Sequence, residues 1–133
     1  DVRKLMFQVK KKQGTDIARS FDGLNEPRNL EHSIKFANEA GMISQAALSV
    51  THSKVHTVQY YIDLAEKLIG YGAKEICIKD MAGLLTPNVT KELVESLVKN
   101  ISLPIHMHCH ATSGLATVNL FTAIEAGATI IDT

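Results

Sequence analysis

The stretch EICIKDMAGLLTP, residues 75–87, contains an apolar run that ends in Lys79 and Asp80 and is followed by a turn of small residues and a proline. The run predicts a buried strand, and the segment TPNVTKELVESLVKN (86–100) has the apolar spacing of a helix. Thr86 can cap that helix, with Pro87 at its first position. A lone ammonium is costly to bury, so Lys79 must be paired, deprotonated or chemically altered.

The same order of strand, polar end and helix recurs along the chain. It predicts strands at 16–22, 42–51, 75–80, 104–110 and 128–133, and helices at 2–14, 26–41, 55–72, 86–100 and 112–127. We expect the strands to be apolar on both faces, as parallel strands covered by helices are. The polar ends of the strands are Asp22, Thr51, Lys79, His108 and Asp132, and their spacing of 24 to 29 residues fits one βα unit each. Right-handed crossovers would bring these ends to one edge of a parallel sheet, where α/β folds carry their sites.

Five predicted strands fit two α/β architectures. An open sheet of five could stand alone, whereas a (β/α)8 TIM barrel needs about 250 residues, so these 133 could form only part of one. No glycine-rich nucleotide-binding motif follows any strand, so the usual reasons for an open sheet are missing. Composition does not decide between the two.

Composition narrows the class of protein. The net charge is zero and 45% of the residues are hydrophobic, which predicts a packed soluble domain and argues against a nucleic-acid surface. The basic run KKK at 10–12 suits the end of a helix, where cations complement the dipole. Cys77 and Cys109 lack zinc-finger spacing and predict reduced core thiols and a cytoplasmic location. No apolar run reaches the length of a membrane span.

Three histidines, His106, His108 and His110, alternate along one predicted strand. At this spacing they share a face, and any two successive rings could reach one metal ion; equally, they could be hydrogen-bonded mouth or core residues. His106 lies deepest and is the least suited to be a ligand. Lys79 should lie beside His108, either paired with Asp80 or Glu75, or extended to the mouth, or carrying CO2 as a carbamate whose oxygens could bind a metal.

The segments ICIKDMAGLLTP, PIHMHCHATSGLA and FDGLNEPRNL resemble the carboxyltransferase domain of biotin-dependent enzymes. That family includes pyruvate carboxylase, the transcarboxylase subunit and the α subunit of oxaloacetate decarboxylase. The similarity spans roughly residues 16–133, and the short connection LSVTHSKVHTVQYYIDLAEKL is most similar to the decarboxylase. Ala111, where relatives carry aspartate, agrees with that branch.

The resemblance implies a (β/α)8 barrel of which residues 1–133 form a partial domain, from about strand 4 to strand 8. It implies a divalent metal, zinc first and cobalt or manganese next, held by Lys79, His108 and His110, with Lys79 often carbamylated in the family. The family's aspartate ligand on the first strand has no counterpart here. Asp80 is expected to orient Lys79 or to pair with a neighbouring group, and Asp22 to face the substrate or to support the structure.

The implied reaction is transfer of CO2 between a keto acid, oxaloacetate or pyruvate, and biotin, with Lys79 as the catalytic residue. The biotin would be carried by a biotin carboxyl-carrier domain, the assembly would be a homo-oligomer, and a decarboxylase would add membrane subunits. Three alternatives remain: a pyruvate carboxylase or transcarboxylase domain, a metal-dependent lyase of the same barrel family, or a piece that is inactive by itself. The lysine of the KDMAG motif argues against the lyase.

Overall fold

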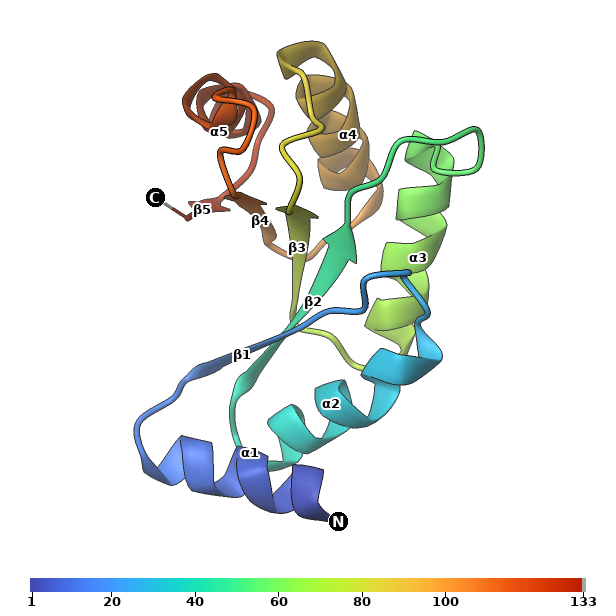
Figure 1. The fold of residues 1–133 in the computed structure, drawn as a ribbon. Coiled ribbons are helices and arrows are strands. Elements are labelled where there is room, and N and C mark those ends of the chain that lie inside the picture. The colour runs from blue at the N-terminus through green and yellow to red at the C-terminus, as the bar shows by residue number, and fades with distance from the viewer. Residues whose placement is uncertain (133) are drawn as a thin grey trace.

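The computed structural model describes residues 1–132, in which five helices alternate with five strands (Figure 1). The helices are α1 (Val2–Lys12), α2 (Arg28–Glu39), α3 (Val58–Gly70), α4 (Pro87–Asn100) and α5 (Ala116–Glu125). The strands are β1 (Ile17–Ser20), β2 (Ile43–Ser49), β3 (Glu75–Asp80), β4 (Ile105–Cys109) and β5 (Ile130–Ile131). Every predicted element is confirmed with ends shifted by up to four residues; the end of the last predicted strand, Thr133, lies outside the described residues.

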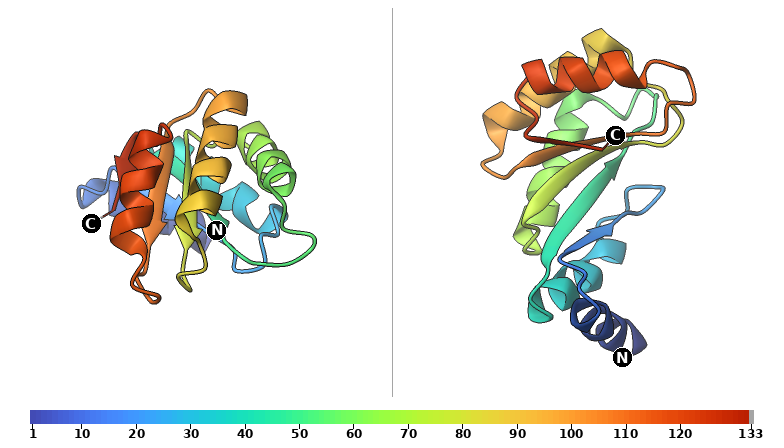
Figure 2. Two further views of the ribbon diagram at one scale, coloured as in Figure 1. Left: turned by 90° about the horizontal axis from the view of Figure 1, so that it is seen from above. Right: turned by 90° about the vertical axis from the view of Figure 1, so that its left-hand side faces the viewer.

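The strands form one parallel sheet in the order β1-β2-β3-β4-β5. In a doubly wound open sheet the strand order reverses at a switch point and helices cover both faces. Here the order follows the chain, and α3, α4 and α5 lie on the same side of the sheet (Figure 2). This topology is that of consecutive units of a β/α barrel, so it favours the barrel over the independent open sheet.

The helix-covered face of the sheet is apolar. Its main core joins residues of β2, β3 and β4 to α3, α4 and α5, and the strand residues in it are Ala46, Leu48, Ile76, Ile78, Ile105 and Met107. A smaller core links α1 and α2 through Phe7, Phe36, Ala37 and Met42. Burial of these side chains is the main force that holds the helices to the sheet.

The opposite face of the same strands is polar, so the expectation of strands apolar on both faces is wrong. Side chains alternate across a strand. The residues between the core positions include Arg19, Gln45, Ser49, Glu75, Cys77, Lys79, His106 and His108. Most of them are nonetheless shielded from solvent: Gln45 is 1% exposed and His106 is 6% exposed.

Local signals account for the helix ends. Tyr60 N–H donates to the Thr57 hydroxyl at the start of α3, while Pro87 occupies the first turn of α4 after the N-cap residue Thr86, whose side chain makes no capping bond. Gly72, with φ +100°, follows α3 in the left-handed conformation. Lysines 10–12 form the last turn of α1, as predicted. Among residues 1–132 no helix has the length and apolarity needed to cross a membrane.

Candidate functional site

Lys79 and His108 end neighbouring strands and are directly paired in the register of β3 with β4. His110 follows one residue after the end of β4, and its ring lies 4.9 Å from that of His108, centroid to centroid, at an interplanar angle of 85°. The Lys79 Nζ atom is 3.5 Å from His110 Nε2. The structure therefore brings together all three predicted site residues at the carboxyl edge of the sheet.

Within residues 1–132, Lys79 is buried without a carboxylate partner. It is 8% exposed, and among the described residues it forms no salt bridge. Its ammonium instead lies 4.9 Å from the centre of the Phe21 ring. The interpretation that Lys79 pairs with Asp80 or Glu75 is wrong, because both carboxylates have other partners.

Asp80 shapes the loop that follows β3. Its two carboxylate oxygens accept hydrogen bonds from the backbone N–H groups of Leu84 and Leu85, at 2.9 and 3.0 Å. The prediction that Asp80 orients Lys79 finds no supporting contact among the described residues. Asp80 instead anchors the turn that leads to α4.

Two of the five predicted strand ends turn away from this cluster. Asp22 accepts hydrogen bonds from the N–H groups of Leu24 and Glu26 and from the Asn29 amide, so it holds its own loop and serves structural support, one of the two roles expected for it. Thr51 bonds through its backbone to the Tyr61 hydroxyl. The polar ends of the sheet converge only in part.

Asp132 is the carboxylate that does face the histidines. His108 Nδ1 lies 2.5 Å from Asp132 Oδ2, and His106 Nε2 lies 2.6 Å from Oδ1. Arg19, reaching across from β1, donates from Nη1 to Asp132 Oδ2 at 2.7 Å. Three donors from β1 and β4 thus meet one carboxylate beside β5.

The polar network continues toward the amino ends of the strands. The Gln45 carbonyl oxygen accepts from Arg19 Nε, and the Gln45 amide donates to Glu75 at 2.7 Å and contacts His106 Nδ1 at 3.0 Å. Both ring nitrogens of His106 are therefore engaged, which agrees with the expectation that it is the least suited of the three histidines to bind a metal.

Charge and burial set the protonation of the central pair. Burial by itself raises the pKa of Asp132, but the hydrogen bonds from Arg19, His108 and His106 outweigh it and hold the pKa well below its usual range. Burial lowers the pKa of His108 despite the bond to Asp132, and the nearby Lys79 charge adds to this. The pair is an ionised carboxylate beside a neutral imidazole at neutral pH.

One atom of this cluster is left without a partner. His108 Nε2 is buried and makes no hydrogen bond with any residue from 1 to 132, and buried polar atoms are rarely left unsatisfied. A neutral imidazole nitrogen of this kind is a common metal ligand. Within residues 1–132 no three His, Cys, Asp or Glu side chains form a metal cluster. The residues present fit a metal with two imidazoles, and Lys79, whose Nζ lies 3.5 Å from His110 Nε2, could add an oxygen ligand through a carbamate.

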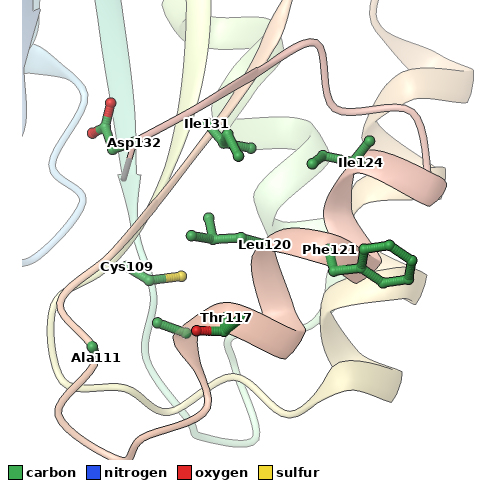
Figure 3. Close-up of a pocket in the computed structure, with 9 residues that line it drawn as sticks. Cys109, Ala111, Thr117, Leu120, Phe121, Ile124, Ile131 and Asp132 are labelled. Atoms are coloured by element: carbon green, nitrogen blue, oxygen red, sulfur yellow. The ribbon is translucent and has the colours of Figure 1, made fainter.

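A hollow of about 520 Å³ lies on the other side of β4 and β5, against α5 (Figure 3). Figure 3 shows Leu120 and Ile131 between the helix and the strands, with the Asp132 carboxylate directed away from them. The lining side chains are almost all apolar, so the hollow offers little chemistry. Asp132 borders it and belongs to the polar face.

Sequence reasoning missed Arg19 and Gln45, and it gave Asp132 no role beyond ending a strand. The available signal was the alternation within each strand, which places Arg19, Gln45 and Glu75 level with one another on one face. A charged side chain in the middle of a predicted buried strand was the sign that this face is polar.

Comparison with known proteins matches residues 6–133 to the HMGL-like family model. A pyruvate carboxylase subunit of Methanocaldococcus jannaschii is 52% identical over 119 residues, which cover 90% of this chain and 21% of that protein. The methylmalonyl-CoA carboxyltransferase 5S subunit of Propionibacterium freudenreichii subsp. shermanii is 39% identical over 90% of this chain and 24% of its own length. This chain thus spans less than a quarter of these relatives.

Among solved structures, the carboxyl transferase domain of Rhizobium etli pyruvate carboxylase superposes with a TM-score of 0.92 at 36% identity, covering 98% of this chain and 23% of that one. The same domain with pyruvate and biocytin gives a TM-score of 0.94. The five strands therefore match part of a carboxyltransferase TIM-barrel domain. These relatives support the pyruvate carboxylase and transcarboxylase alternative better than the oxaloacetate decarboxylase that the sequence analysis favoured.

Proposed function

Because the chain belongs to the HMGL-like family, we propose that it forms the metal-binding part of a biotin-dependent carboxyltransferase domain. The reaction would move CO2 between a keto acid, pyruvate or oxaloacetate, and biotin on a carrier domain. The relatives named for pyruvate carboxylase and methylmalonyl-CoA carboxyltransferase, and the Rhizobium etli domain with pyruvate and biocytin, support this substrate pair. We place the chain at about strands 4 to 8 of the barrel.

The observation that carries the proposal is the cluster of Lys79, His108 and His110. Within the described part of the chain, it combines a buried lysine that has no carboxylate partner with a buried imidazole nitrogen that has no hydrogen bond. A carbamate on Lys79 would replace an isolated buried cation by an anion with oxygen atoms that can bind a metal, and pairing with the divalent ion would offset the cost of burying that charge. Zinc, cobalt or manganese would suit imidazole and carboxylate-like ligands.

The residues of this chain would hold and shield the reacting groups. A divalent ion at His108 and His110 would act as a Lewis acid toward the carbonyl oxygen of the keto acid. The phenyl ring of Phe21, 4.9 Å from Lys79 Nζ, would cover one side of the lysine. The aspartate ligand that the family carries on its first strand would come from a part of the parent protein that these residues do not include.

Metal content and carboxyl transfer in the full-length parent test the proposal. We expect about one divalent metal per chain in the wild type and its loss in a His108→Ala, His110→Ala double variant. Carboxyl transfer from oxaloacetate to biocytin should fall by about 100-fold or more in that double variant and in Lys79→Ala. The exposed residues His32 and Lys74 give matched controls, His32→Ala and Lys74→Ala, which should retain metal and activity. A double variant that keeps its metal would contradict the site.

The same assay separates the alternatives. A metal-dependent lyase would cleave its substrate with no biotin present, whereas the proposed enzyme would not. The oxaloacetate decarboxylase interpretation keeps the support of the short 48–68 connection and of Ala111, which the structure holds at φ +61°. Its distinguishing result would be co-purification of the parent with a membrane-embedded subunit.

A further inference from the structure

We propose that Asp132 is a positioning residue for the metal site: it fixes the ring of His108 so that Nε2 is the free ligand atom. The inference rests on the metal site proposed above and adds to it a residue that lies outside the KDMAG and H-x-H motifs. It depends on the geometry of one carboxylate and its three donors.

The tautomer of His108 follows from its partner. A carboxylate paired with a guanidinium offers only acceptor atoms, and Asp132 is bound by Arg19 Nη1 at 2.7 Å. The 2.5 Å contact between His108 Nδ1 and Asp132 Oδ2 therefore requires the hydrogen to be on Nδ1. In a neutral ring this leaves the lone pair on Nε2, the buried atom that has no partner among the residues that the structure describes.

His106 provides the contrast within the same network. Arg19 Nε is a donor, so the Gln45 atom facing it is the carbonyl oxygen, and the Gln45 amide group faces Glu75 and His106 Nδ1. His106 Nδ1 therefore faces the Gln45 amide, and His106 Nε2 lies 2.6 Å from Asp132 Oδ1 and 3.0 Å from Arg19 Nη2. One carboxylate thus contacts two imidazoles: both ring nitrogens of His106 have polar partners, whereas His108 keeps one nitrogen without a partner among the described residues.

The carboxylate itself is held by groups that do not belong to the metal cluster. Arg19 comes from β1 and His106 from the lower part of β4; both bond to Asp132, and among the described residues neither has a hydrogen bond to His110 or Lys79. The ring of His108 is therefore oriented before any ion arrives. Hydrogen-bonded carboxylates behind histidine ligands strengthen metal binding by about 10 to 100-fold.

The test compares metal affinity in the full-length parent after the bound metal has been stripped with a chelator. Co2+ is titrated against a chelator of known affinity at constant bicarbonate, and the visible absorption of bound Co2+ is recorded. We expect Asp132→Asn to weaken Co2+ binding about 10 to 100-fold and to alter the absorption spectrum, while circular dichroism and subunit size stay unchanged. Asp63→Asn, at an exposed aspartate of α3, is the matched control, because it makes the same chemical change outside the network around Asp132.

Each result decides the proposal. A much larger loss of affinity in Asp132→Asn than in Asp63→Asn supports it. Equal affinity in Asp132→Asn and wild type, or equal losses in the two variants, overturns the positioning role while the metal site stands, provided that His108→Ala has lost its metal. A wild type without metal, or a His108→Ala variant that retains it, overturns the metal site and this inference together. If Asp132→Asn does not fold, Asp132→Glu, which moves the carboxylate by one methylene, gives the same comparison.

Discussion

The two faces of the sheet are made by alternate residues of the same strands and have opposite characters. Along β3, Ile76 and Ile78 enter the apolar core beneath the helices, whereas Glu75, Cys77 and Lys79 face the polar side. Both sets are buried in this strand. The apolar face should tolerate other apolar side chains that fill the same volume. Each polar residue has specific hydrogen-bond partners. The stability of the protein should therefore respond differently to substitutions on the two faces.

The largest effect on stability should come from the apolar face. Ile78→Ala removes three buried carbon atoms from a fully enclosed position and should lower the free energy of unfolding by about 2–5 kcal/mol. Urea denaturation of the full-length parent, followed by a signal specific to this domain, measures it. Ile124→Ala, on the exposed side of α5, is the control, and a loss as large there would mean that burial in the sheet core is not the cause.

A substitution on the polar face should lower the stability less, and for a different reason. Gln45→Leu keeps the volume but leaves the Glu75 carboxylate, the Arg19 Nε group and His106 Nδ1 without the amide that joins them, so we expect a loss of about 3 kcal/mol. Thermal unfolding would report it. Gln59→Leu, on the exposed side of α3, should change stability by about 0.5 kcal/mol or less, and an equally mild effect at Gln45 would show that the network is dispensable.

A substitution at Gly83 tests how the loop after β3 packs against the loop after β4. A Cβ atom there would lie 2.8 Å from the Ser113 backbone nitrogen, and the glycine has φ +68°, so Gly83→Ala should cost about 1–3 kcal/mol. Because Ser113 follows His110 in the same loop, metal affinity should fall as well. Gly23→Ala, with open space around it and no positive φ, is the control. Unchanged metal affinity in a destabilised Gly83→Ala would separate the loop packing from the site.

The two cysteines, one on each face of the sheet, should show the smallest effect, a difference in their reactivity toward an alkylating reagent. Burial raises the pKa of Cys77, on the polar face, to about 12, and that of Cys109, on the hollow side, to about 11. At pH 8 both are neutral thiols, so iodoacetamide should modify neither in the folded protein. As the pH rises, the thiolate fraction grows, and Cys109 should react first. Peptide mass mapping would detect this, and rapid labelling of Cys77 at pH 8 would contradict the structure.

The sequence was sufficient for the fold and for the motif residues. Strand and helix periods, the proline of α4 and the lysines ending α1 predicted every element, and the register places Lys79 beside His108 as expected. The sequence was insufficient for the second face, because short strands of mixed residues such as IARS carry too few alternations to separate a polar face from an apolar one. Contacts over long sequence separations, above all Arg19 with Asp132, depend on the curvature of the sheet and leave no local signal.

The turn after β3 bears on how such proteins are recognised. Asp80 accepts two backbone hydrogen bonds and Gly83 makes room for Ser113, so these two residues of the KDMAG motif determine the conformation of the turn. Only Lys79 among the three stands in the chemical cluster. A distant homologue whose lysine has been replaced could therefore still keep Asp80 and Gly83, because the turn requires them. A search based on the motif would still detect that homologue. Assigning activity to such a homologue requires its lysine and both histidines to be inspected one by one.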